Sequence, residues 1–231
     1  AVCSALALAS GAQALAQETE EKELRNETIT VRDVKADTNP YGDPDAPYRA
    51  IRSASGLFTE DLIDTPKSIT VNSDEVLKDL GADTFRDLFR SQPGITLGTG
   101  EGGNAFGDRY IIRGHEARSD VFVDGVRDPG MSTRESFANE QLEITKGPSA
   151  TFAGRGSSGG AVNSITKQAN TDKNFSVVKA GVGSDDYHRI TLDSNAVISD
   201  RLAVRVNVLE AKGDAPDRDS IEQKRLGGLF S

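Results

Sequence analysis

Residues 142–167 constrain the fold more than any other part of the chain. The stretch opens with the alternating apolar residues Leu142 and Ile144, and it closes with the β-prone run Ala-Val-Asn-Ser-Ile-Thr. Between these runs lie Gly, Pro and Ser residues, which favour tight, irregular backbone. The pattern therefore predicts two short strands that flank a loop, and hence a domain built on a sheet.

The same loop contains a glycine pattern that nucleotide-binding proteins also use. Residues 154–159 read Gly-Arg-Gly-Ser-Ser-Gly, and Asp172 follows at about the twenty-residue distance of the dinucleotide fingerprint. That fingerprint needs a hydrophobic strand before it and a helix after it. Here Ser-Ala-Thr-Phe-Ala precedes the glycines and a β-prone segment follows them. Nucleotide binding is therefore not predicted.

Two short helices are expected before this stretch. Ser73 is suited to cap the first helix, because acidic residues follow it directly and favour the positive helix end. The second helix begins at residue 83 or 84, and Pro-Gly at 93–94 ends it. Its apolar face is formed by Phe85, Leu88 and Phe89. We interpret these three side chains as core and assign them no chemistry.

Several motifs in this region resemble the plug domain of TonB-dependent outer-membrane receptors. They are Asp-Thr-Pro-Lys-Ser-Ile-Thr-Val at 64–71, Ile-Arg-Gly at 112–114, Val-Asp-Gly at 123–125, and Lys-Gly-Pro with Gly-Arg-Gly-Ser-Ser-Gly-Gly between 146 and 160. His115 departs from the apolar residue usual at its position, and we base no function on it. The resemblance implies a small mixed-sheet α+β plug domain over residues 49–168.

The sequence pattern changes after residue 170 to long alternating segments. In residues 201–209, Leu202, Val204, Val206 and Val208 share one face and polar residues occupy much of the other. A soluble, half-buried sheet gives the same alternation, but the plug resemblance favours the first strands of a transmembrane antiparallel β-barrel in residues 170–231. Only three strands and the start of a fourth fit there, whereas a closed barrel needs at least about eight. We therefore expect a mainly β, truncated receptor.

The first 48 residues suggest export followed by a flexible linker. Residues 1–16 are small and apolar and end in Ala-Leu-Ala, which predicts a partial signal peptide, although a short buried helix would also fit. Residues 17–48 are acidic and poor in aromatic side chains, which is typical of a disordered periplasmic linker. The expected location is the bacterial outer membrane, with membrane lipid around the barrel.

A β-prone island, Glu27, Thr28, Ile29, Thr30 and Val31, interrupts this linker. An isolated strand-forming segment suits addition to the edge of a partner's sheet. The segment resembles the TonB box, which implies TonB, working with ExbB and ExbD, as the partner. The alternative is a strand that docks on its own domain.

The resemblance also suggests a ligand. The run Arg-Asp-x-Gly…Thr-Arg-Glu-Ser-Phe at 127–137 is similar to receptors for ferric catecholate siderophores. A net-anionic iron complex favours Arg donors and aromatic surface. The candidate siderophore-binding residues, taken from the loops at 99–109 and 128–137, are Phe106, Arg109, Met131 and Arg134. Another bulky substrate, such as cobalamin, haem or a carbohydrate, and a soluble periplasmic interaction module remain the alternatives.

Other functional classes find little support. A formal charge of −9 with scattered basic residues disfavours nucleic acid. The single cysteine, Cys3, excludes a disulfide framework or a cysteine-based metal site. The two histidines, His115 and His188, come without a nucleophile elbow, and no carboxylate pair has distinctive spacing. We therefore expect no enzymatic activity, no cofactor and no protein-bound metal; the siderophore itself would carry the iron.

Overall fold

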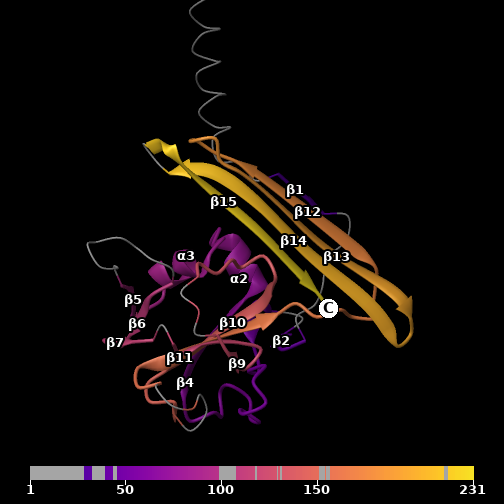
Figure 1. Ribbon diagram of the computed structural model, residues 1–231. Helices are drawn as coiled ribbons and strands as arrows, with labels where there is room; N and C mark the ends of the chain where they lie inside the picture. Colours follow the sequence, from indigo (N-terminus) through magenta and orange to yellow (C-terminus); the bar gives the residue numbers. More distant parts are fainter. Residues whose placement is uncertain are drawn as a thin grey trace, which may run out of the picture. The chain divides into compact units, whose positions relative to one another are not determined.

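The computed structural model describes residues 29–32, 40–43, 46–98, 108–117, 119–128, 130, 132–150, 154, 157–215 and 218–231 (Figure 1). The chain divides into two compact units. One unit lies within residues 37–169, and the other contains residues 170–230 together with strand β1 (Ile29–Arg32). Each unit is described by itself.

A five-stranded mixed sheet forms the centre of the first unit. Its order is β4-β10-β11-β8-β9, with bounds β4 (Ser68–Ser73), β10 (Asn139–Lys146), β11 (Gly160–Thr166), β8 (Val121–Val123) and β9 (Val126–Arg127). Strands β11 and β8 pair in parallel, and the other pairs are antiparallel. The predicted strand-loop-strand at 142–167 is confirmed as β10 and β11.

Two helices pack beside this sheet where the sequence predicts them. Helix α2 (Asp74–Asp79) starts after Ser73, whose side chain accepts a hydrogen bond from the Val76 amide. Helix α3 (Phe85–Arg90) starts after Thr84, which forms a reciprocal capping box with Asp87. In the described part of the chain, no helix is long and apolar enough to cross a membrane.

The core of this unit lies between α3 and the sheet. Its fully buried side chains include Leu88, Phe89, Tyr110, Ile112, Leu142, Ile144 and Val162. The rings of Phe89 and Tyr110 meet edge to face, with 4.3 Å between their centroids. The three apolar positions of α3 are therefore core, as predicted.

Smaller strands complete the first unit. A three-stranded sheet contains β5 (Ile95–Leu97), β6 (Tyr110–Ile112) and β7 (His115–Glu116). Strands β2 (Gly42–Asp43) and β3 (Ala46–Ala50) form a hairpin. The β5–β6 pair positions the residues that directly follow the loop at 99–107, and it therefore matters for the candidate site.

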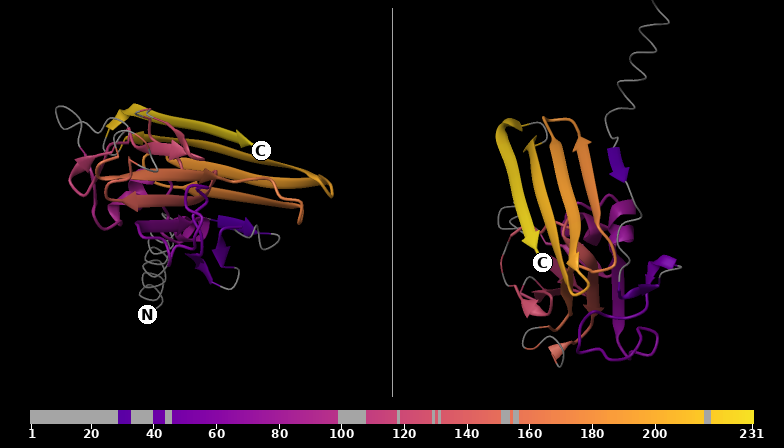
Figure 2. Two further views of the ribbon diagram at one scale, coloured as in Figure 1. Left: turned by 90° about the horizontal axis from the view of Figure 1, so that it is seen from below. Right: turned by 90° about the vertical axis from the view of Figure 1, so that its right-hand side faces the viewer.

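The second unit is one antiparallel sheet of long, twisted strands (Figure 2). Its order is β1-β12-β13-β14-β15, with bounds β12 (Phe175–Val182), β13 (His188–Ser199), β14 (Leu202–Ala215) and β15 (Arg218–Phe230). Strand β14 runs beyond the predicted end at residue 209. Four strands follow residue 170, and β15 is nearly as long as β14, whereas the sequence suggested only the start of a fourth.

The two faces of this sheet differ as the alternation predicts. Large apolar side chains that stay exposed are Val178, Val182, Ile190, Ile198, Leu202, Val208, Leu226 and Phe230. On the other face of β14, Arg205 and Asn207 are buried. The Arg205 guanidinium donates twice to the Asp193 carboxylate, at 2.8 Å for each bond, and lies 5.1 Å from the Phe175 ring centre. An exposed apolar face, opposite a face that carries buried polar side chains, is the pattern of a membrane barrel strand.

Candidate functional site

The ends of the two loops chosen from the sequence meet in the structure. The Asp108 amide donates a 3.3 Å hydrogen bond to the Ser132 carbonyl. In return, the Asp108 carboxylate accepts a 2.7 Å hydrogen bond from the Arg134 amide. Residues that close the loop at 99–109 are therefore joined to residues of the loop at 128–137.

Arg134 is buried and organises its own loop. Its side chain is 8% exposed. The guanidinium donates to the Asp128 carboxylate at 2.9 Å, to the carbonyls of Asp128 and Gly130 at 2.9 Å, and to the Ser132 carbonyl at 3.5 Å. Five fixed N–H donors allow a single guanidinium to hold several carbonyls at once. In this structure Arg134 therefore holds residues 128, 130 and 132 together through their carbonyls.

The segment after Arg134 is fixed to the start of α3. The Phe85 amide donates to the Arg134 carbonyl at 3.1 Å, and the Ser136 amide donates to the Asp83 carbonyl at 2.9 Å. The Ser136 hydroxyl also donates to the Ala82 carbonyl, at 2.6 Å. The loop at 128–137 is therefore attached to a helix terminus that the core holds in place.

Asp108 lies in an unusual electrostatic position. Burial raises the pKa of Asp108 above its ordinary value, while the Arg134 charge acts in the opposite direction. Burial and the nearby Asp108 charge raise the pKa of Tyr110. The Tyr110 hydroxyl also interacts with the Asp108 carboxyl, and this interaction acts against the rise in the Asp108 pKa. This corner is thus buried and polar.

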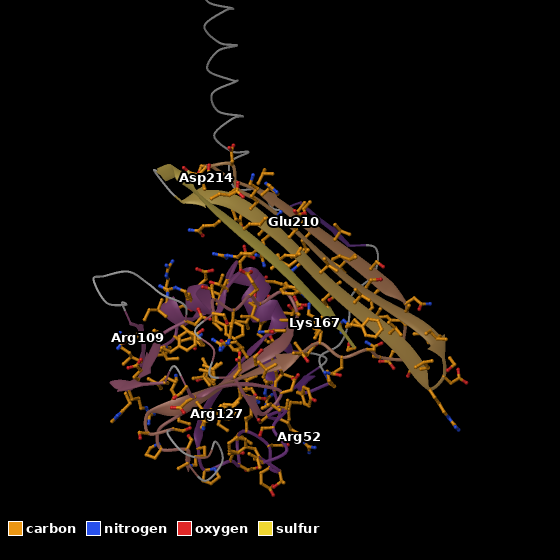
Figure 3. All side chains as sticks on the ribbon, viewed as in Figure 1. Arg52, Arg109, Arg127, Lys167, Glu210 and Asp214 are labelled. Atoms are coloured by element: carbon orange, nitrogen blue, oxygen red, sulfur yellow. The ribbon has the colours of Figure 1, made fainter. Side chains whose placement is uncertain are left out.

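Of the two candidate siderophore-binding residues that the structure describes, Arg109 and Arg134, Arg109 is the one that reaches the surface. Its guanidinium forms two hydrogen bonds with the Glu116 carboxylate, at 3.0 and 3.2 Å, and its side chain is 38% exposed. The Arg109 side chain is labelled in Figure 3. Its aliphatic carbons lie so close to Gly98 that a side chain there would meet them. Glycine at 98 therefore makes room for Arg109.

The structure describes some of the remaining predicted site residues and not others. Phe106, Met131, Glu27 and Thr28 lie outside the described residues. The other residues of the predicted TonB box, Ile29, Thr30 and Val31, belong to β1, which pairs antiparallel with β12. Their Cα partners are Ala180, Lys179 and Val178. The described part of the segment thus lies on a sheet edge of its own chain.

Sequence reasoning missed Asp108, Asp128 and Glu143. Asp108 and Arg134 are 26 residues apart, and no spacing pattern links them. Glu143 sits between Leu142 and Ile144 on β10, so alternation places it on the other face of the sheet. It is nevertheless only 3% exposed. Only the structure shows what covers it.

The Ile-Arg-Gly and Lys-Gly-Pro motifs also come together. The Arg113 guanidinium lies so close to the α-carbon of Gly147 that a side chain there would touch it. Burial, with a contribution from the Arg113 charge, lowers the pKa of Lys146. Among described residues, no group of three or more His, Cys, Asp or Glu side chains could hold a metal ion.

Residues 61–161 match the family model of the TonB-dependent receptor plug domain. The probable TonB-dependent siderophore receptor PiuA of Acinetobacter baumannii is 42% identical over 177 residues, which are 76% of this chain and 24% of PiuA. The chain belongs to the TonB-dependent receptors. It spans about a quarter of the length of the curated relatives that it matches, PiuA among them. Like the family, the chain is an outer-membrane protein, so the predicted family and location are confirmed.

Two further relatives of this receptor differ in ligand. The catecholate siderophore receptor Fiu of Escherichia coli K12 is 38% identical over 182 residues, covering 78% of this chain and 24% of Fiu. The metal-pseudopaline receptor CntO of Pseudomonas aeruginosa is 33% identical over 225 residues, covering 95% of this chain and 30% of CntO.

Solved structures agree with the fold of the receptor. The crystal structure of PiuA superposes with a TM-score of 0.75 at 39% identity, covering 81% of this chain and 27% of PiuA. The closed form of Fiu gives the same TM-score at 36% identity, covering 80% of this chain and 26% of Fiu. The predicted fold, a plug followed by barrel strands, is confirmed.

Proposed function

We propose that the receptor takes up a ferric siderophore, of the catecholate type, across the outer membrane. One observation carries this proposal. The similarity to the catecholate receptor Fiu covers 78% of this chain, so it must include residues 99–137, whichever end of the chain it omits. Both candidate ligand loops therefore lie in the part that resembles a catecholate receptor.

The candidate site supplies chemistry that suits an anionic complex. Arg109 is partly exposed beside the loop at 99–107, and a guanidinium forms charge-assisted hydrogen bonds with anionic oxygens. We propose that Phe106, Arg109 and Met131 contact the siderophore, and that Arg134 contributes by shaping the loop at 128–132. The ferric siderophore is cargo, and we propose no resident cofactor, no protein-bound metal and no enzymatic step.

Energy for uptake would enter through the amino-terminal segment. We propose that Glu27, Thr28, Ile29, Thr30 and Val31 bind TonB, driven by ExbB and ExbD, through strand addition. The described part of this segment adopts strand conformation as β1 and pairs with β12, so binding to TonB would require it to leave that edge. Ligand on one side and TonB on the other would bias the plug between a blocking and a permissive state.

The proposed function assigns a role to each segment of the chain. Residues 1–16 are a partial signal peptide and residues 17–48 a periplasmic linker. Residues 49–168 are the plug, and residues 170–231 are the first strands of the barrel, in contact with membrane lipid. The family match at 61–161 falls inside the proposed plug.

Radio-iron uptake tests the function. Cells that lack their own siderophore receptors would express the intact receptor, with or without residues 27–31, and receive a ferric catecholate. We expect iron uptake that disappears on deletion, while binding at the cell surface persists. Surface expression without any binding would reject the catecholate assignment. Uptake of another metal–chelator complex instead would favour the activity of CntO-like receptors.

A further inference from the structure

The loop at 128–132 is held by one buried side chain. The Arg134 guanidinium reaches the carbonyls of residues 128, 130 and 132, with distances of 2.9, 2.9 and 3.5 Å. These are alternate residues, so one side chain fixes three described positions of this segment. Arg134 also contacts the Asp128 carboxylate at 2.9 Å, which balances its charge.

Asp108 ties this loop to the other candidate loop. Its carboxylate accepts from the Arg134 amide at 2.7 Å, and the same oxygen lies 3.6 Å from the Arg134 guanidinium. Its own amide donates to the Ser132 carbonyl at 3.3 Å. The Asp108 side chain is fully buried, whereas the next residue, Arg109, reaches the surface. The position of Asp108 therefore determines where the Arg109 side chain reaches the surface.

Both sides of this connection rest on α3. The Arg134 carbonyl accepts from the Phe85 amide at 3.1 Å. On the other side, Tyr110 follows Asp108 by two residues, and its ring packs on Phe89. Asp108 and Arg134 are thus supported by the same helix, and a shift of one residue would strain its hydrogen bonds to the other.

We propose that Asp108, through Arg134, is a positioning residue that fixes Arg109 relative to residues 128, 130 and 132, in the arrangement that binds siderophore. The inference rests on the proposed function, because only then are the loops ligand loops. Asp108 is too deeply buried to touch a ligand, so it acts through Arg109 and the loop at 128–132. This role depends on the hydrogen bonds of Asp108 and not on its charge, because Asp128 also gives Arg134 a carboxylate partner.

The first test needs no ligand. Amide hydrogen exchange, resolved to single residues, would be measured on the intact receptor in detergent. We expect Asp108→Ala to raise exchange at the Arg134 amide by about tenfold or more, because the amide loses its acceptor. Asp108→Asn keeps an acceptor oxygen and should stay near wild type. Asp61→Ala is the matched control, since Asp61 pairs with the exposed Arg52.

The second test measures binding of a ferric catecholate to cells that display each variant. Asp108→Ala should weaken binding by about tenfold, and Asp108→Asn and Arg52→Gln should bind as wild type does. Where Asp108→Ala does not reach the outer membrane, Arg134→Lys replaces it. That variant keeps the positive charge but loses the guanidinium that contacts three carbonyls at once, and it should also weaken binding.

The two tests separate the possible failures. Unchanged exchange at the Arg134 amide in Asp108→Ala would overturn the proposal, whatever the ligand. Raised exchange with unchanged binding would overturn it as well, because the connection would then not position ligand loops. Wild-type receptor that binds no ferric catecholate would refute the proposed function, and the exchange result would still decide whether Asp108 joins the loops.

Discussion

The Ser53 hydroxyl donates a 2.7 Å hydrogen bond to the Glu143 carboxylate across 90 residues of sequence. The Ala54 amide and the Gln141 side chain donate to the other oxygen of the same carboxylate, at 2.6 and 2.7 Å. Glu143 therefore connects the segment around Ser53 to β10, an interior strand of the plug sheet. A buried carboxylate with three donors is fixed firmly by its partners.

Replacing Glu143 by Leu should destabilise the plug by about 3 kcal/mol, because buried donors at Ser53 and Gln141 and a partly buried donor at Ala54 lose their acceptor. Urea unfolding of the intact receptor, followed through a fluorophore at an introduced cysteine at the exposed Leu57, measures the change. The exposed Glu60→Leu variant serves as the control. Equal unfolding midpoints for the two variants would show that the Glu143 bonds do not stabilise the plug.

Gly160→Ala should destabilise the plug severely, by roughly 3 kcal/mol or more, since a β-carbon at 160 would collide with the Thr145 carbonyl. The backbone of Gly160 also has a φ of +144°, which disfavours any side chain. Gly56→Ala is the matched control, because open space surrounds that position. The same urea titration distinguishes them, and an unshifted midpoint in Gly160→Ala would contradict the packing described.

The stability of the plug should depend on pH through Asp108. Burial raises the pKa of Asp108 above its ordinary 3.8, so the folded state favours the protonated form. The stabilising contribution is therefore complete below pH 3.8 and is lost as the pH rises through the raised pKa. Asp108→Asn lacks this titration. We expect the urea midpoint of wild type, relative to that of Asp108→Asn, to fall as the pH rises above 3.8; a difference that does not change with pH would contradict this prediction.

Asp193→Ala should destabilise the barrel sheet by about 3 kcal/mol, because it leaves Arg205, which is 1% exposed, without its carboxylate. The temperature at which the folded receptor loses its fast migration in SDS gels reports this loss. Glu222→Ala is the control: its partner Lys212 is 41% exposed, and exposed pairs contribute little. Equal melting of the two variants would rule out a structural role for the Arg205 pair.

Much of the fold can be predicted from local sequence signals. Ser73 and Thr84 mark the helix starts because their hydroxyls accept from the first-turn amides. The alternation around Val206 gives β14 its two faces, because side chains on a strand point to opposite sides in turn. Such signals need only neighbours in sequence, so a single chain reveals them.

The candidate site was harder to predict because its contacts join distant residues. Sequence drew attention to Arg109 and Arg134 through the loops that contain them, but it could not show that Asp108 holds Arg134 below the surface. It likewise gave no sign that residues near 53 would cover Glu143. The pairing of β1 with β12 depends on which sheet edge is available, which no local pattern in the linker records.

The most direct test of the account is the effect of Ile29→Pro on transport by the intact receptor. Proline has no amide hydrogen to donate and interrupts strand addition. Ile29→Ala, which keeps that donor, is the control. We expect Ile29→Pro to bind ferric catecholate as wild type does but to lose iron uptake, while Ile29→Ala retains it. Uptake by Ile29→Pro at the wild-type rate would contradict energy coupling through this strand.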